Sequence, residues 1–169
     1  MAGLKINTFP DSMLRKKAAR VAGVGDSEKK ILKDMAEAMY LNRGVGLAAV
    51  QVGIDKQLAV VDVGKGLLKL VNPVIVKKEG SEIEEEGCLS VPQALVKVKR
   101  AAKIVVNFLN EEGLVTEMEA EGLLGRAIQH EIDHLSGVLI IDYLNPIKKF
   151  FALKKKTLKK KILDKTRAM

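Results

Sequence analysis

Two histidines four residues apart are the clearest sign of chemistry in this chain. His130 and His134 are the only histidines among 169 residues, and Glu131 lies beside the first of them. On a helix, residues four apart share a face, so both imidazoles can bind one metal ion. A neighbouring carboxylate can then exchange protons with metal-bound water, as in the His-Glu-x-x-His pattern of metal-dependent hydrolases. We therefore predict a catalytic metal site, against the alternative of a surface helix that carries two histidines by chance.

A catalytic metal site of this kind needs a third protein ligand besides the two histidines. The candidates are a carboxylate and Cys88, the single cysteine of the chain. Cys88 lies in a Gly-Cys turn flanked by strand-like sequence, which can expose its sulfur, although a buried structural cysteine is the alternative. Beside the histidine motif we favour Cys88 as the ligand.

The hydrophobic pattern predicts which elements position these residues. Residues 122–136 are expected to form a helix that is buried on most sides and ends at Gly137. A first helix is expected over residues 27–42 with Ser27 as its N-cap. Strands are expected at residues 57–63, 68–77 (with Pro73 at an edge or bulge), 96–99, 104–109, 114–120 and 138–141. Residues 44–53 are rich in glycine and alanine, which indicates a tight turn before a strand.

The composition is that of one domain with an aliphatic core. Apolar residues make up 47% of the chain, but aromatic residues only 4%. The sequence lacks both an apolar run of about 20 residues, which a membrane span needs, and the apolar region of a signal peptide. A single cysteine also excludes an internal disulfide, so we expect a cytoplasmic protein without a transmembrane segment.

Positive charge is concentrated at the C-terminus. The chain has a net charge of +8, yet residues 148–169 contain ten basic residues and one acidic residue, and the remainder is close to neutral. We expect residues 147–169 to form a basic amphipathic helix that extends a catalytic domain at residues 1–146. Such a helix can bind an anionic partner. The alternatives are a solvated helix packed on the body of the protein and a helix that binds an anionic membrane surface.

Three motifs in this order resemble those of peptide deformylases. They are Gly44-Val45-Gly46-Leu47-Ala48-Ala49-Val50-Gln51, Glu86-Gly87-Cys88-Leu89-Ser90 and Gln129-His130-Glu131-Ile132-Asp133-His134. The resemblance implies an α+β fold with β-sheets wrapped around a central buried helix that carries the histidine motif. It implies removal of the N-formyl group from the N-terminal methionine of newly synthesised polypeptides, with release of formate. It also implies Cys88, His130 and His134 as ligands of one divalent metal ion. Ferrous iron is the expected metal, and zinc, nickel and cobalt are alternatives.

The resemblance further assigns roles to residues around the metal. Metal-bound hydroxide is expected to attack the formyl carbon, with Glu131 as general base and then general acid. The side-chain amide of Gln51 and the backbone N–H of Leu89 are expected to donate hydrogen bonds to the oxyanion. The residues expected to bind the substrate are Val45, Gly46, Gly87, Leu123, Arg126 and Ala127, together with the ring of His130.

Four charged residues in or near the motifs are expected to lie around the site. Arg126 stands where the family commonly has an apolar residue, and we expect its aliphatic stem to line the methionine pocket with its charged head in solvent. Glu86, Arg100 and Asp133 are expected to support the metal ligands, with ordinary ion pairs as the alternative.

Two rival functions use parts of the same sequence. The basic C-terminal segment also suits a non-catalytic protein that binds RNA or the ribosome, and in a deformylase it suits docking on ribosomal RNA. The histidine motif alone suits a zinc protease. Such a protease usually takes its third ligand from another histidine or an acid, so Cys88 and Gln51 favour the deformylase interpretation.

Overall fold

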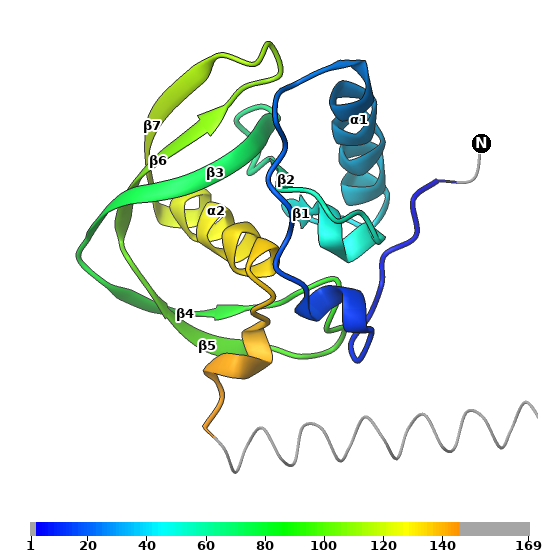
Figure 1. Cartoon of the computed structure of the whole chain (residues 1–169). Helices are drawn as coiled ribbons and strands as arrows, with labels where there is room; N and C mark the ends of the chain where they lie inside the picture. The colour runs from blue at the N-terminus through cyan, green and yellow to red at the C-terminus, as the bar shows by residue number, and fades with distance from the viewer. Residues whose placement is uncertain (1–2, 146–169) are drawn as a thin grey trace, which may run out of the picture.

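Two antiparallel sheets and two α-helices form residues 3–145, the part of the chain that the computed structural model describes (Figure 1). The larger sheet has the strand order β1-β2-β3-β6-β7, and the smaller sheet pairs β4 with β5. The strands are β1 (Gly46–Ala48), β2 (Leu58–Val61), β3 (Leu68–Glu79), β4 (Glu82–Glu86), β5 (Val96–Arg100), β6 (Lys103–Leu109) and β7 (Val115–Glu121). The α-helices are α1 (Asp26–Leu41) and α2 (Gly122–Leu135).

Helix α2 packs against strands from both ends of the larger sheet, namely β1, β2, β6 and β7. Its buried residues Ala127, Ile128 and Leu135 join a cluster with side chains of the sheet such as Leu70 and Val106. In the view of Figure 1, α2 lies between β3 and the β4–β5 pair. The helix is therefore surrounded by protein on several sides, as its apolar sequence requires.

Helix α1 covers the β1–β2 end of the larger sheet with a second apolar cluster. It begins at Asp26, and its N-cap is Gly25, so the predicted cap at Ser27 is wrong. The Glu28 carboxylate accepts a hydrogen bond from the Gly25 backbone N–H at 3.1 Å. Because this side chain reaches back over the first turn, it satisfies a free N–H group and allows the helix to begin earlier.

Most predicted strands are present, but residues Gly46–Ala48, which were expected to lie in a tight turn, form strand β1. The bulge expected at Pro73 is confirmed, since the register between β3 and β6 shifts between Val71 and Val74. The strand expected at residues 138–141 is wrong, because residues Ile140–Tyr143 form a 3-10 helix, η3. Asp142 closes this turn by accepting the Leu139 N–H at 2.9 Å. The acidic run at residues 82–86, which carries no apolar alternation, is strand β4.

Residues 3–25 form a segment that is irregular apart from the 3-10 helix η1 (Ser12–Arg15). This segment, here called the N-terminal strap, joins the three motif-bearing regions. Its Asn7 N–H donates to the Gln51 carbonyl at 2.7 Å, and its Phe9 N–H donates to the Ser90 carbonyl at 2.8 Å. Its Ala18 N–H donates to the carbonyl of Leu135, the last residue of α2, at 2.8 Å. The N-terminal strap thus holds together three segments that are far apart in the sequence.

Two predictions concern other parts of the molecule. The basic C-terminal helix expected at residues 147–169 lies outside the described residues. Among residues 3–145, no helix has both the length and the apolar character that crossing a membrane requires.

Candidate metal centre and substrate pocket

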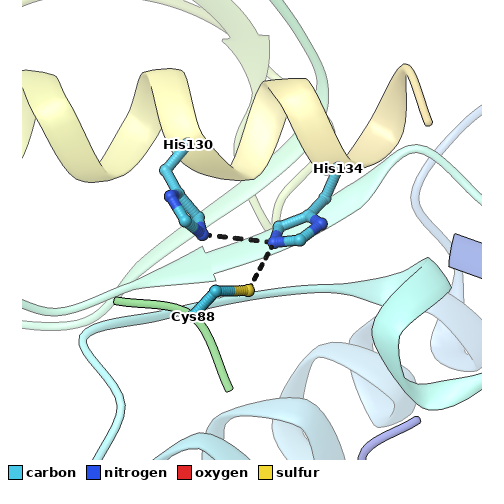
Figure 2. A group of neighbouring side chains, drawn as sticks. All are labelled: Cys88, His130 and His134. Atoms are coloured by element: carbon cyan, nitrogen blue, oxygen red, sulfur yellow. Dashed lines mark hydrogen bonds between the residues drawn. The ribbon is translucent and has the colours of Figure 1, made fainter. Parts of the chain in front are cut away.

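Cys88, His130 and His134 converge on one point (Figure 2). Helix α2 carries the two histidines on successive turns, and Cys88 follows directly after β4. His134 Nε2 lies 3.2 Å from Cys88 Sγ and 3.2 Å from His130 Nε2. The three ligand atoms lie within 4.8 Å of one another, so a single ion can contact all of them.

The chemistry of these donors fits a divalent transition metal. One thiolate sulfur and two imidazole nitrogens suit iron, zinc, nickel or cobalt. In the same place, Glu131 Oε2 is buried without a hydrogen-bond partner among the described residues. A buried carboxylate oxygen is costly to leave unpaired, and a water at a metal held by Cys88, His130 and His134 would supply a donor to this oxygen.

Glu86 fixes the orientation of His130. His130 Nδ1 lies 2.9 Å from Glu86 Oε2. Because an ionised carboxylate can only accept, Nδ1 carries the proton, and the Nε2 lone pair is left for a metal. Burial opposes ionisation of Glu86, but hydrogen bonds from Arg100 and His130 outweigh it and lower the pKa of Glu86 to about 2. Glu86 is therefore a carboxylate at any physiological pH.

Arg100 joins the expected supporting residues in one network. It donates to Glu86 through Nε at 2.7 Å and Nη2 at 2.9 Å, and to Asp133 through Nη1 at 2.7 Å. Tyr143 was not predicted as a site residue, yet its hydroxyl donates a hydrogen bond to the same Asp133 carboxylate at 2.7 Å. The network therefore links β4, β5, α2 and η3 behind the histidines.

Arg126 differs from its prediction, since its charged head is not in solvent. The residue is only 6% exposed. Its guanidinium contacts Glu86 at 2.8 Å and Glu84 at 3.2 Å, and it donates to the Val98 carbonyl at 3.1 Å. The reason is the acidic strand β4, which lies beside α2 and offers the buried guanidinium its charge partners.

Burial contributes to the pKa shifts of Glu131, His134 and His130. Burial raises the pKa of Glu131 to about 7, although the positive charges of His130 and Arg100 oppose this. Burial also lowers the pKa of His134 well below its usual value. Burial lowers the pKa of His130 too, but hydrogen bonds with Cys88 and Glu86 outweigh it and raise that pKa to about 10.

The glycines of the first motif leave space for other residues. Neither Gly44 nor Gly46 has a positive φ, so the backbone conformation does not itself require glycine at these positions. A methyl group on Gly46 would overlap the Glu131 carboxylate, and one on Gly44 would lie 2.8 Å from Leu89 Cδ1. Strand β1 can therefore approach Glu131 only with glycine at position 46.

Gln51 is held by two neighbours and faces the cysteine. It lies in the 3-10 helix η2 (Ala49–Val52) and is only 2% exposed. Its Oε1 accepts the Ala48 N–H at 2.8 Å, and its Nε2 donates to Ser90 Oγ at 3.1 Å. The Nε2 atom lies 3.8 Å from Cys88 Sγ. Ser90 belongs to the second motif, but the sequence did not predict its contact with Gln51.

One pocket of about 790 Å³ opens beside these residues. Its lining contains every residue predicted to act directly on the substrate, namely Val45, Gly46, Gln51, Gly87, Leu89, Leu123, Arg126, Ala127, His130 and Glu131. It also contains Arg43, Glu84, Glu85 and Leu95, which the sequence did not suggest. Arg43 directly precedes the first motif, and the two glutamates precede the second, so closeness to the motifs is the signal that could have found them.

Known proteins resemble this chain over most of its length. A family model described as polypeptide deformylase matches residues 3–150. A peptide deformylase of Caldanaerobacter subterraneus is 54% identical over 142 residues, which cover 84% of this chain and 89% of the relative.

Solved structures resemble the fold as well. The crystal structure of a peptide deformylase from Legionella pneumophila has a TM-score of 0.89 at 42% identity, covering 96% of this chain and 98% of that one. A peptide deformylase from Ehrlichia chaffeensis, in complex with actinonin, also has a TM-score of 0.89, at 38% identity, with 94% and 98% covered. The similarity thus extends far beyond the three motifs.

Proposed function

Since this chain belongs to the peptide deformylase family of hydrolases, we propose that it removes the formyl group from the N-terminal methionine of newly synthesised polypeptides and releases formate. The observation that carries the proposal is the convergence of Cys88, His130 and His134 beside the buried Glu131, at one wall of an open pocket. In this proposal the two sheets wrap around α2, which carries His130, Glu131 and His134.

The family depends on a metal, and Cys88, His130 and His134 are the ligands we propose. Ferrous iron is the ion we propose, and zinc, nickel and cobalt also suit one sulfur and two nitrogens. A divalent ion held there lowers the pKa of water and polarises the formyl oxygen. Glu86, Arg100 and Asp133 support this site by holding His130 in the form that leaves Nε2 free.

Glu131 carries the proton in this mechanism. Its carboxylate takes one proton from the attacking water as the water oxygen bonds to the formyl carbon. It then gives that proton to the leaving α-amine as the carbon–nitrogen bond breaks, which yields formate and a free N-terminus. The apolar surroundings that raise its pKa to about 7 suit a group that must both accept and donate a proton near neutral pH.

Two donors stabilise the negative charge on the former formyl oxygen. Gln51 Nε2 donates one N–H to Ser90, and its second N–H points to Cys88 Sγ over a long contact of 3.8 Å. This second N–H is the one that we propose donates to the oxyanion. The backbone N–H of Leu89 is the other donor. Losing one such donor typically costs about 3 kcal/mol of barrier.

The pocket accounts for recognition of the substrate. Leu123, Ala127, Val45, the stem of Arg126 and the His130 ring supply an apolar lining for the methionine side chain. Val45, Gly46 and Gly87 place main-chain groups at the same pocket, where an extended peptide backbone can pair in strand fashion.

We propose that the basic segment at residues 147–169 extends the catalytic domain at residues 1–146 and brings the reaction to the ribosome. We propose that it binds ribosomal RNA in the cytoplasm, where new chains emerge. Its ten basic residues also support the second candidate, a protein whose main role is RNA or ribosome binding. Deletion of residues 148–169 separates the two interpretations. Loss of ribosome affinity with retained deformylation supports our proposal, whereas unchanged affinity removes the docking role.

Formate release from formyl-Met-Ala by the anaerobic, iron-loaded protein tests the activity. The matched control is Glu131→Gln, which we expect to retain metal but lose turnover. Absence of activity in the iron-loaded wild type would overturn the proposal. Cys88→Ala tests the ligand set separately, since retention of metal by that variant would favour a zinc-protease type of site.

A further inference from the structure

We propose that Arg126 is a positioning residue that holds Glu86 against His130 and thereby controls how firmly the metal is retained. The same side chain forms part of the substrate pocket with its aliphatic stem. The inference rests on the proposed function, because it assumes that His130 binds a metal ion. It assigns a use to the buried guanidinium of Arg126, which has no role in the proposed mechanism.

The Glu86 carboxylate receives four hydrogen bonds, two on each oxygen. Oε1 accepts from Arg100 Nε at 2.7 Å and from Arg126 Nη1 at 2.8 Å. Oε2 accepts from Arg100 Nη2 at 2.9 Å and from His130 Nδ1 at 2.9 Å. Because a carboxylate offers about four acceptor sites, this one is fully used and has no freedom to turn.

Arg126 and His130 hold the carboxylate from the same helix face. They are four residues apart on α2, so they lie on successive turns and reach the two oxygens of Glu86 side by side. Arg100 approaches the same carboxylate from β5. Without Arg126, Arg100 would still hold Glu86, but His130 would be the only contact from α2. The carboxylate could then turn about the Arg100 contact and away from Nδ1.

Arg126 is itself fixed by the small sheet. Besides Glu86, it contacts the Val98 carbonyl at 3.1 Å, the Glu82 carbonyl at 3.3 Å and Glu84 at 3.2 Å. These partners belong to β4 and β5. The guanidinium therefore ties α2 to both strands, and its rigid fork is needed because several acceptors in different directions must be reached at once.

The stem and the head of Arg126 do separate work, which makes the inference testable. The residue lines the pocket beside Leu123 and Ala127, while its head is directed to β4 and β5. Methionine at position 126 keeps an unbranched, apolar stem but lacks every donor. Arg126→Met should therefore leave KM for formyl-Met-Ala nearly unchanged and lower kcat through a poorly held His130.

The deciding measurement is the release of Co²⁺ from the cobalt-loaded full-length protein to excess chelator, together with its visible absorption spectrum. We expect Arg126→Met to release Co²⁺ about tenfold faster or more, since partners of metal-bound histidines typically contribute 10- to 100-fold to metal affinity. We also expect a changed visible spectrum. The control Lys56→Met removes the Lys56–Glu28 ion pair, which has a 2.6 Å contact and no atom in the pocket lining. It should lower thermal stability without changing either cobalt signal.

A second variant keeps the test decisive where Arg126→Met does not fold. Arg126→Lys retains the positive charge, but a single ammonium cannot contact Glu86 and both strand carbonyls at once. Its release rate should fall between those of the wild type and Arg126→Met. A wild-type release rate and spectrum in a folded Arg126 variant, or changes no larger than those of Lys56→Met, would overturn the inference. Neither signal requires turnover, so this failure is distinct from absence of deformylase activity.

Discussion

Ser90 accepts a hydrogen bond from the Gln51 side-chain amide at 3.1 Å, and the serine is fully buried. The bond fixes the direction of Nε2, the atom we propose as an oxyanion donor. Ser90→Ala should therefore loosen Nε2, leaving the Gln51 amide held by the Ala48 N–H on Oε1, without removing its own N–H groups. We expect kcat for formyl-Met-Ala to fall about tenfold, which corresponds to about 1.4 kcal/mol, with KM and metal content unchanged.

A double-mutant cycle checks that Ser90 acts through Gln51. Gln51→Leu alone should cost about 3 kcal/mol of barrier, and adding Ser90→Ala to it should have little further effect. Ser27→Ala, at an exposed position of α1, provides the matched control and should retain full activity. Additive losses of kcat in the double variant would contradict the positioning role of Ser90.

A methyl group at position 46 should displace the Glu131 carboxylate. Gly46 does not have a positive φ, so its backbone conformation is open to alanine, and the three atoms nearest to the added Cβ all belong to the Glu131 side chain. A shift of about 1 Å in a reacting group can cost roughly 100-fold in rate. We therefore expect Gly46→Ala to lower kcat by about that factor while the protein retains its metal. Gly23→Ala, whose added methyl group meets nothing within 4 Å, should have wild-type kinetics.

Local spacing explains what the sequence could predict about the site. His130 and His134 lie on one face of any helix that contains them, and the apolar residues around them indicate that the helix is buried. The second ligand-bearing motif could be recognised because Cys88 is the only cysteine. These inferences need no knowledge of which segments lie side by side.

Long-range neighbours explain what the sequence could not predict. The partners of Arg126 lie 28 to 44 residues away on strands β4 and β5, so nothing near Arg126 in the chain indicates that its head is buried. Tyr143 was assigned to no site, and the apolar run at residues 138–141 predicted a short buried strand, whereas Asp142 closes a 3-10 turn there. The N-terminal strap has no regular pattern, and its order comes from hydrogen bonds to Gln51, Ser90 and Leu135.

Tyr143 should ionise at unusually high pH. Burial and the hydrogen bond to Asp133 raise the pKa of Tyr143 to about 12, from an ordinary value of 10.0. Since the folded pKa is higher than the unfolded one, the contribution of Tyr143 to stability is complete below pH 10 and is lost as the pH rises through about 12. Phenolate absorbance of the protein should show this late step, and circular dichroism should confirm that the fold persists below it.

The tyrosine content makes that titration simple to interpret. The chain has only two tyrosines, and a hydrogen bond to Asp62 also raises the pKa of Tyr40. Tyr143→Phe should remove the step near pH 12 and leave the ionisation of Tyr40 unchanged. Ionisation of both tyrosines at pH 10 in the folded protein would contradict the hydrogen bond between Tyr143 and Asp133.

Asn72 should be important for stability because it pins the N-terminal strap to the bulge of β3. Its Oδ1 accepts the Val21 N–H at 3.0 Å and its Nδ2 donates to the Val21 carbonyl at 2.8 Å, while its own φ is 52°. Asn72→Gly removes two hydrogen bonds but tolerates the positive φ, so we expect a loss of about 2 kcal/mol in the free energy of unfolding. Asn72→Ala also places a Cβ in the left-handed region and should lose about 1 kcal/mol more. Urea unfolding of the three proteins measures both differences, and equal stability of the glycine and alanine variants would exclude the backbone contribution.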